Sequence, residues 1–122
     1  MALDPRSGRV FVAGSHIVRV LDARSGDAAG TIALPGEPAA VAVAVRTGRV
    51  LVTATVDGTY AGPIPTSPKH GVALLLDART GKVLRAVHTG QDPTSVAIDE
   101  QRGRAFVTNI NDASLSVIDL TP

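Results

Sequence analysis

The sequence predicts an all-β protein assembled from repeated antiparallel units. Short runs rich in valine, isoleucine and threonine alternate with turn residues along the chain, and no window has the length and periodicity of an amphipathic helix. One hexapeptide pattern also occurs three times, as SGRVFV at 7–12, TGRVLV at 47–52 and RGRAFV at 102–107. Internal repetition of this kind indicates a repeat architecture rather than a β-sandwich.

The spacing of the repeats predicts the kind of architecture. Gly8 and Gly48 are 40 positions apart, whereas Gly48 and Gly103 are 55 apart, so the period is near 40 and the second copy carries an insertion of about 15 residues. A second element, LDARSG at 21–26, LDARTG at 76–81 and IDLT at 118–121, places that insertion between Thr55 and Val72. A period near 40 with four strands per unit is typical of a β-propeller blade. The predicted fold class is therefore a β-propeller fragment of about three four-stranded antiparallel blades.

The turn residues divide each predicted blade into strands. In the second repeat we expect strands at 40–45, 49–55, 72–77 and 83–88. The glycines of the connecting turns stand where a tight hairpin needs a residue with positive φ. The blades are expected at 1–38, at 39–93 with a loop insertion at 56–71, and at 94–122. Residues 1–4 align with 41–44 and 96–99, so we expect the chain to begin at an innermost strand and the third blade to lack its outer strand.

The third repeat resembles a known family. The segment Phe106–Asn109, followed by Leu115–Asp119, is similar to the Y-V-T-N and S-V-I-D signatures of the YVTN-type β-propeller repeat family. Gly90–Pro93, followed by Val96–Ile98, resembles the G-x-x-P-x-x-V-A junction between its blades. The match is partial in the second repeat and weaker in the first. The resemblance implies a propeller fold and does not specify a function.

Three blades are too few to close a ring, because propellers close with roughly four to eight. We expect either the remaining blades of a longer chain or a second copy that forms a homodimer and closes a six-bladed ring. Open blade faces rich in valine and leucine predict self-association or marginal stability of the isolated chain.

Composition argues against several classes of function. The 12 basic and 11 acidic residues are interspersed and leave a formal net charge of +1, so we expect no nucleic-acid partner. Cysteine is absent, which excludes disulfides and thiolate metal sites. No apolar stretch approaches the roughly 20 residues of a transmembrane helix, so no membrane insertion is expected. The N-terminal residues lack the pattern of a secretory signal, which makes a cytoplasmic location the default and an extracytoplasmic one an option if the N-terminus is truncated.

One face of the predicted propeller is the candidate binding surface. The loop between the second and third strands of a blade opens on the same face as the link to the next blade, and loops on a rigid scaffold concentrate function. The insertion at 56–71 holds three prolines and the only tyrosine and is a candidate contact arm, although a tolerated insertion without a role explains it equally well. The candidate ligand- or partner-binding residues on this face are Asp57, Tyr60, Lys69, His70, Glu37, Asp92, Asn109, Asn111 and Asp112.

The sequence nominates no catalytic residue. The histidines His16, His70 and His88 are irregularly spaced and come from two blades, so we expect no metal and no cofactor. Aspartates recur at one repeat position beside a turn, where they are expected to accept backbone hydrogen bonds; they are Asp22, Asp77 and Asp119. Phosphate-binding loops, nucleophile elbows and dinucleotide fingerprints are absent from the sequence.

These observations favour a non-catalytic binding or scaffold module, whose partner is a protein, a peptide or a small ligand held at the loop face and the insertion. One alternative is a fragment of a propeller enzyme, such as a lactonase-like hydrolase, with active residues from several blades. Another is a truncated product without independent activity. Fold analogy alone does not separate these functions.

Overall fold

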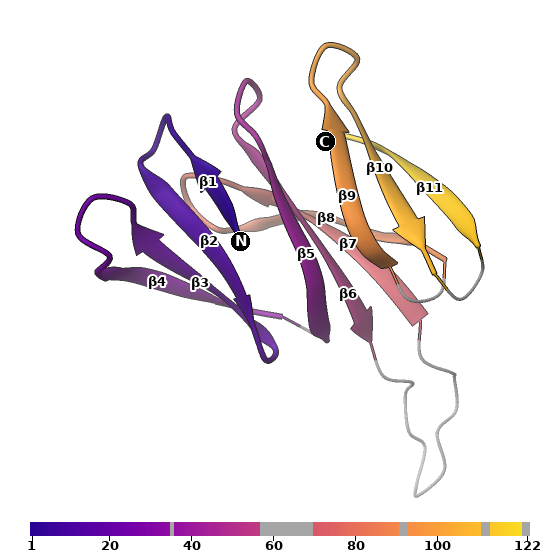
Figure 1. Ribbon diagram of the computed structural model, residues 1–122, viewed down its shortest axis with the longest axis horizontal. Helices are drawn as coiled ribbons and strands as arrows, with labels where there is room; N and C mark the ends of the chain where they lie inside the picture. Colours follow the sequence, from indigo (N-terminus) through magenta and orange to yellow (C-terminus); the bar gives the residue numbers. More distant parts are fainter. Residues whose placement is uncertain (35, 57–69, 91–92, 111–112, 121–122) are drawn as a thin grey trace, which may run out of the picture.

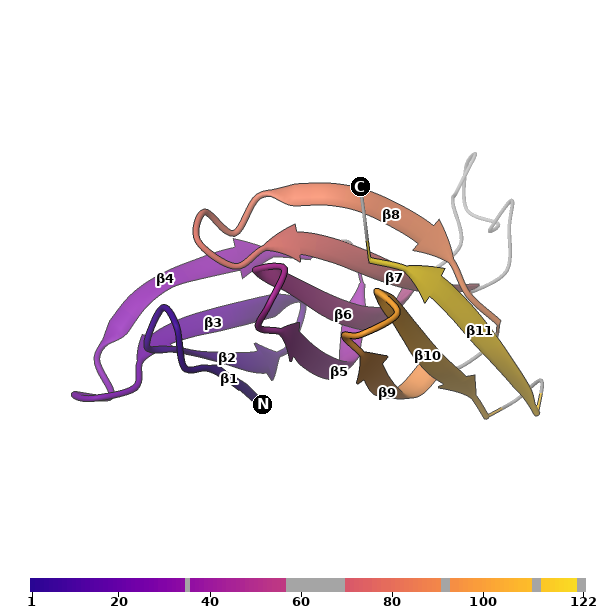
Figure 2. The ribbon, with the colours of Figure 1, turned by 90° about the horizontal axis from the view of Figure 1, so that it is seen from above.

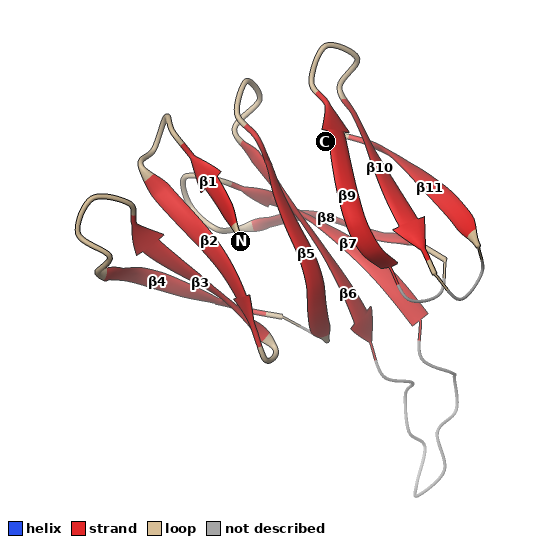
Figure 3. Cartoon of the chain, in the orientation of Figure 1, coloured by secondary structure: helices blue, strands red, loops and turns tan. Residues whose placement is uncertain are grey.

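The computed structural model describes residues 1–34, 36–56, 70–90, 93–110 and 113–120. Its described residues form strands and turns without a helix, which confirms the predicted all-β class (Figure 3). The strands are β1 (Ala2–Asp4), β2 (Arg9–Gly14), β3 (Ile17–Asp22), β4 (Ala28–Ala33), β5 (Glu37–Ala44), β6 (Arg49–Val56), β7 (His70–Asp77), β8 (Val83–His88), β9 (Pro93–Asp99), β10 (Arg104–Asn109) and β11 (Ser114–Asp119).

The strands form three antiparallel sheets, each with its strands in chain order: β1-β2-β3-β4, β5-β6-β7-β8 and β9-β10-β11. The sheets stand side by side, with β5 between β1 and β9 (Figure 1). Seen from above, β1, β5 and β9 lie along one side of the molecule, and β4 and β8 lie along the other (Figure 2). The protein is therefore a three-bladed segment of a β-propeller, and its third blade has three strands among the described residues, as the sequence predicts.

Three strands of the second blade extend further than the sequence predicts. β5 begins at Glu37, because a register shift between Pro38 and Ala40 lets it continue its pairing with β6. β6 and β7 remain paired as far as Val56 and His70, so the predicted insertion at 56–71 shrinks to 57–69, which lies outside the described residues. Pro93, which the sequence predicts in the link between the second and third blades, is instead the first residue of β9.

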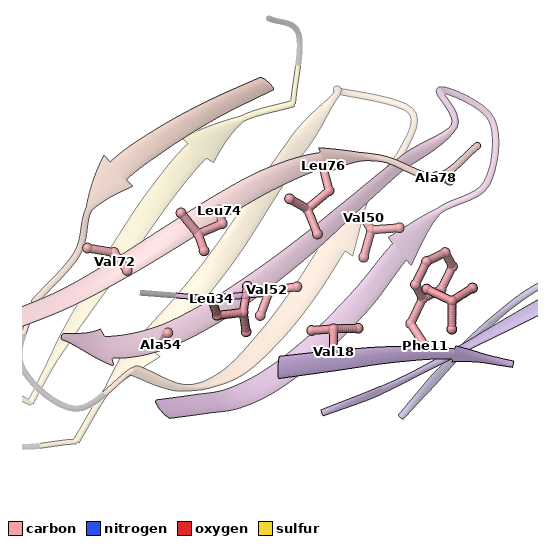
Figure 4. Close-up of a cluster of buried hydrophobic side chains, with 11 residues drawn as sticks. Phe11, Val18, Leu34, Val50, Val52, Ala54, Val72, Leu74, Leu76 and Ala78 are labelled. Carbon is pink, nitrogen blue, oxygen red and sulfur yellow. The ribbon is translucent and has the colours of Figure 1, made fainter. Parts of the chain in front are cut away.

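The blades are held together by two apolar clusters, one on each face of the middle sheet. The first cluster joins the β1–β4 and β5–β8 sheets and contains Phe11, Val18, Val20, Leu34, Val50, Val52, Ala54, Val72, Leu74, Leu76 and Ala78 (Figure 4). The second joins the β5–β8 and β9–β11 sheets and contains Ala44, Leu51, Ala73, Leu75, Ala105, Val107, Ile118 and Leu120. Alternate residues along β6 and β7 thus serve opposite neighbours, as the period of two in a β-strand dictates.

One repeat position shows how this packing is transmitted from blade to blade. Phe11 and Leu51 occupy that position in the first two repeats. Each is only 1% exposed, because it packs against the next sheet along the chain. Burial of such side chains contributes about 1.5–3 kcal/mol each. Phe106 occupies the same position in the third repeat, where it is only partly buried because the described residues contain no fourth sheet.

The hairpin turns follow the chemistry that the sequence predicts. Gly8 and Gly48 have φ values of 71° and 69°, and their N–H groups close the turns on the Asp4 and Ala44 carbonyls. At the β3–β4 turn, Asp22 Oδ1 accepts the Arg24 N–H at 2.8 Å. At the β7–β8 turn, Asp77 Oδ1 accepts the Arg79 N–H at the same distance. The hydrogen bond from Arg79 N–H is the main cause that lowers the pKa of Asp77 below its usual value.

Gly71, the second residue of β7, packs tightly against the link that leads to the third blade. Its carbonyl accepts the Thr89 N–H at 3.0 Å, which fixes the link beside β7. A Cβ at this position would collide with Thr89 Oγ1 and the Gly90 carbonyl oxygen and would lie 2.8 Å from Pro93 Cδ. Any side chain at position 71 would therefore displace the backbone that connects the second and third blades.

We predict that Gly71→Ala lowers the free energy of unfolding by about 3 kcal/mol, because overpacking against backbone cannot be relieved by a rotamer change. Urea unfolding followed by circular dichroism measures the change. Gly30→Ala in β4 is the matched control, since a Cβ there meets nothing within 4 Å. Equal stability of the two variants would contradict the tight packing at Gly71.

Candidate functional site

The connections between strands gather at two opposite ends of the blades (Figure 1). The turn end contains the hairpin turns β1–β2, β3–β4, β5–β6, β7–β8 and β9–β10. At the loop end the chain leaves β2, β6 and β10 and enters β3, β7 and β11, and there it also passes from β4 to β5 and from β8 to β9. The loop end is the face on which the sequence places the candidate binding residues.

The structure describes only part of the predicted site. Asp57, Tyr60, Lys69, Asp92, Asn111 and Asp112 lie outside the described residues. His70 is placed by its backbone as the first residue of β7, paired with Val56. Glu37 and Asn109 are fully described, and the structure assigns them different environments.

Glu37 joins the first two blades at the loop end. Its Oε1 accepts a hydrogen bond from Ser15 Oγ at 2.8 Å and lies 2.7 Å from His16 Nδ1. Ser15 and His16 form the β2–β3 turn, where His16 has a φ of 60°, so the turn presents both side chains to the start of β5. The His16 and Glu37 side chains are 57% and 56% exposed, which leaves the carboxylate accessible to a partner.

The contact of Ser15 with Glu37 was not predicted from the sequence. The sequence places Glu37 on the candidate binding face, before the strand expected at 40–45, but does not pair it with Ser15. The observed contact requires β5 to begin at Glu37, through the register shift between Pro38 and Ala40. The neighbouring ion-pair contact of His16 with Glu37 is exposed, and exposed ion pairs contribute only about 0–1 kcal/mol to stability.

Asn109 lies beneath the loop-end surface, although the sequence predicts it in an exposed loop. It is the last residue of β10 and is 2% exposed. Its Nδ2 donates hydrogen bonds to Ser114 Oγ at 3.2 Å and Ser116 Oγ at 3.0 Å, both on β11. Asn109 follows Ala105 and Val107 at alternate positions of β10, so its side chain lies on the face that packs against the middle sheet, where it bonds to β11.

The described residues contain no group of three or more histidine, aspartate, glutamate or cysteine side chains that could hold a metal ion. In that same part of the chain there is no helix of the length and apolar character that crossing a membrane requires. The described loop-end side chains of Ser15, His16 and Glu37 supply hydrogen-bonding and charged groups.

The blades and this loop end define a β-propeller segment with a polar connecting face. No model of a known protein family and no curated protein sequence matches the chain. Among solved structures it is similar to Kuenenia stuttgartiensis hydrazine synthase, with a TM-score of 0.77 at 11% sequence identity. The match covers 98% of this chain and 39% of that one. At this identity the similarity concerns the fold alone, and this chain spans about two fifths of its neighbour.

We predict that Asn109→Ala lowers the free energy of unfolding by about 2 kcal/mol, since two partly buried hydrogen bonds are lost, one to Ser114 and one to Ser116. Thr108→Ala, at the exposed neighbouring position of β10, is the control and should change stability by less than about 0.5 kcal/mol. Chemical denaturation measures both variants. If Asn109→Ala is as stable as the control, the amide is not holding the hairpin.

Proposed function

We propose that this protein is a non-catalytic binding module of the YVTN-repeat type, which captures a basic peptide or protein segment at its loop end. The observation that carries the proposal is the exposed Glu37 carboxylate, which Ser15 and His16 hold across the boundary between two blades. A carboxylate positioned by two neighbours loses little conformational entropy when it pairs with a lysine or arginine of a partner.

The sequence of the loop-end connections supports a basic partner. In addition to Glu37, these connections carry Asp57, Asp92 and Asp112 and a single lysine, Lys69. An excess of carboxylates on one face attracts cationic segments and accelerates their association. The segment at 57–69, with the only tyrosine of the chain, supplies an aromatic group of the type that anchors peptide interfaces.

Binding of a fluorescein-labelled oligolysine peptide, followed by anisotropy, tests this function. We expect saturable binding that weakens as salt is added, and Glu37→Lys should reduce the affinity about 5-fold or more. Asp27→Lys reverses the same charge in the β3–β4 turn, at the turn end, and should leave the affinity within about 2-fold. Absence of binding at low salt, or equal losses in both variants, would count against the loop end as the recognition surface.

We also propose that a further blade surface, supplied by a second copy in the isolated chain, covers the open face of the third blade. Leu115 and Val117 on β11 are 57% and 56% exposed, beside the partly buried Phe106. On the opposite side of the molecule, Leu3 on β1 is 54% exposed. Exposed apolar side chains concentrated on sheet faces are typical of surfaces that associate.

We predict that the purified chain forms a discrete dimer of about twice 12.5 kDa and that Leu115→Glu converts it to a monomer, because a carboxylate cannot be buried in that interface unpaired. Size-exclusion chromatography with light scattering measures both masses. Gln101→Glu, an exposed residue of the β9–β10 turn, is the control for added charge. A wild-type chain that remains a soluble monomer at high concentration contradicts the proposal.

A further inference from the structure

A cleft of about 470 Å³ opens at the turn end, between the first and second blades and away from the loop end. Its walls come from the β1–β2, β5–β6 and β7–β8 turns, and its lining residues are Asp4, Arg6, Ser7, Val45, Arg46, Thr47, Gly48, Ala78 and Arg79. This volume falls within the range of sites that hold small molecules.

The cleft brings together three arginines from three separate turns. Arg6, Arg46 and Arg79 are all exposed. Among the described residues, no hydrogen bond or ion pair uses the guanidinium of any of the three. Arginine is the side chain best suited to bind carboxylate and phosphate groups, because its planar fork donates two parallel hydrogen bonds.

The carboxylates near these arginines are already engaged by the turns themselves. Asp4, which lines the cleft and is 3% exposed, accepts the Arg6 N–H at 3.1 Å and the Ser7 hydroxyl at 2.8 Å. Asp77 accepts the Arg79 and Thr80 N–H groups at 2.8 and 3.2 Å. These hydrogen bonds come from neutral N–H and hydroxyl donors, so Asp4 and Asp77 are not bonded to the guanidinium groups of Arg6 and Arg79, although the charge of Arg79 helps to lower the pKa of Asp77.

The walls are fixed by contacts between blades, so the site is organised before a ligand arrives. Arg9 of the first blade donates from Nη1 to the Arg79 carbonyl at 2.6 Å, which ties the β7–β8 turn to the first blade. The Arg46 N–H donates to Glu100 Oε1 of the third blade at 2.7 Å, which ties the β5–β6 turn from the other side. A preorganised site loses less free energy on binding than a mobile one.

At the junction between the second and third blades, the Glu100 carboxylate lies beside the β5–β6 turn. In the repeat alignment, Glu100 of the third blade is equivalent to Val45 of the second. Glu100 reaches back to the Arg46 N–H because Ala44 replaces the aspartate that caps the first turn as Asp4. In the second junction the turn is thus capped by a carboxylate from the next blade, whereas in the first junction Asp4 of the same turn caps the Arg6 N–H and the side chain equivalent to Glu100 is the apolar Val45.

We propose that this cleft binds a small organic anion, with its carboxylate or phosphate on Arg6, Arg46 and Arg79 and its apolar body against Val45 and Ala78. This site is separate from the loop end, so it can fail or succeed independently of the function proposed above. The chemistry selects a compact molecule with one anionic group and an apolar portion, since cationic and apolar lining groups lie side by side in the cleft.

Titration of the ¹⁵N-labelled full chain with phenyl phosphate, benzoate, inorganic phosphate and benzyl alcohol tests the proposal by NMR. We expect phenyl phosphate or benzoate to shift the amides of residues 45–48 and 78–79, with inorganic phosphate weaker and the neutral alcohol inactive. A stronger response to phenyl phosphate identifies a phosphate site, and a stronger response to benzoate identifies a carboxylate site. If no anion shifts these amides, or if the neutral alcohol binds as well as the anions, the proposal is wrong.

Variants of the cleft make the test specific. The double variant Arg46→Gln with Arg79→Gln should weaken binding about 10-fold or more, whereas Arg104→Gln on β10, outside the cleft, should leave it unchanged. Val45→Glu places in the first junction the carboxylate that Glu100 supplies in the second, so it should abolish anion binding while the chain remains folded. Val45→Gln has nearly the same shape without the charge and should retain more of the affinity. Equal binding by Val45→Glu and Val45→Gln would overturn the proposal.

Discussion

The apolar contact between consecutive sheets is the constraint on which the rest of the molecule depends. Each blade is a small antiparallel sheet that cannot bury both of its faces alone, and the middle sheet gains stability only by packing against both neighbours. Phe11 and Leu51 show that the packing has a direction, since each is buried against the sheet that follows its own. A blade therefore presents two different surfaces, and neighbouring blades meet head to tail.

This direction also separates the chemistry of the two ends. Successive strands run in opposite senses, so one end collects the tight hairpin turns and the other collects the longer connections and the links between blades. Each turn-end hairpin carries one arginine: Arg6, Arg24, Arg46, Arg79 and Arg102. The loop-end connections instead carry most of their charge as carboxylates. The turn end also holds carboxylates, at Asp4, Asp22, Asp27, Asp77, Asp99 and Glu100, so charges of both signs meet there.

The features that the sequence predicts correctly are those determined within one repeat. The period predicts the three blades, and the glycine and aspartate positions predict the turns, because a positive φ and a side-chain acceptor are local requirements. The sequence places the insertion at 56–71, but β6 and β7 remain paired as far as Val56 and His70. The sequence of one repeat does not indicate how far two strands stay paired.

The features that the sequence did not predict depend on how blades meet. The contact of Glu37 with Ser15 joins residues of two blades, and the burial of Asn109 depends on both neighbours of β10. The turn-end cleft likewise requires three turns from two sheets to converge. Glu100 accepts the Arg46 N–H that Ala44, unlike the aligned Asp4, has no side-chain acceptor to bind. No pattern within the second repeat reveals that this distant residue supplies the acceptor.

The complete pairing of β6 with β7 has a consequence for engineering. Their register runs without interruption from Arg49 and Asp77 to Val56 and His70, and both strands are bonded on their other sides to β5 and β8. The ends of this hairpin are therefore positioned by the sheet and not by the residues that join them. A foreign peptide or a small sensor domain could replace the connection, and the blade would act as a rigid platform that holds the grafted segment at a defined spacing.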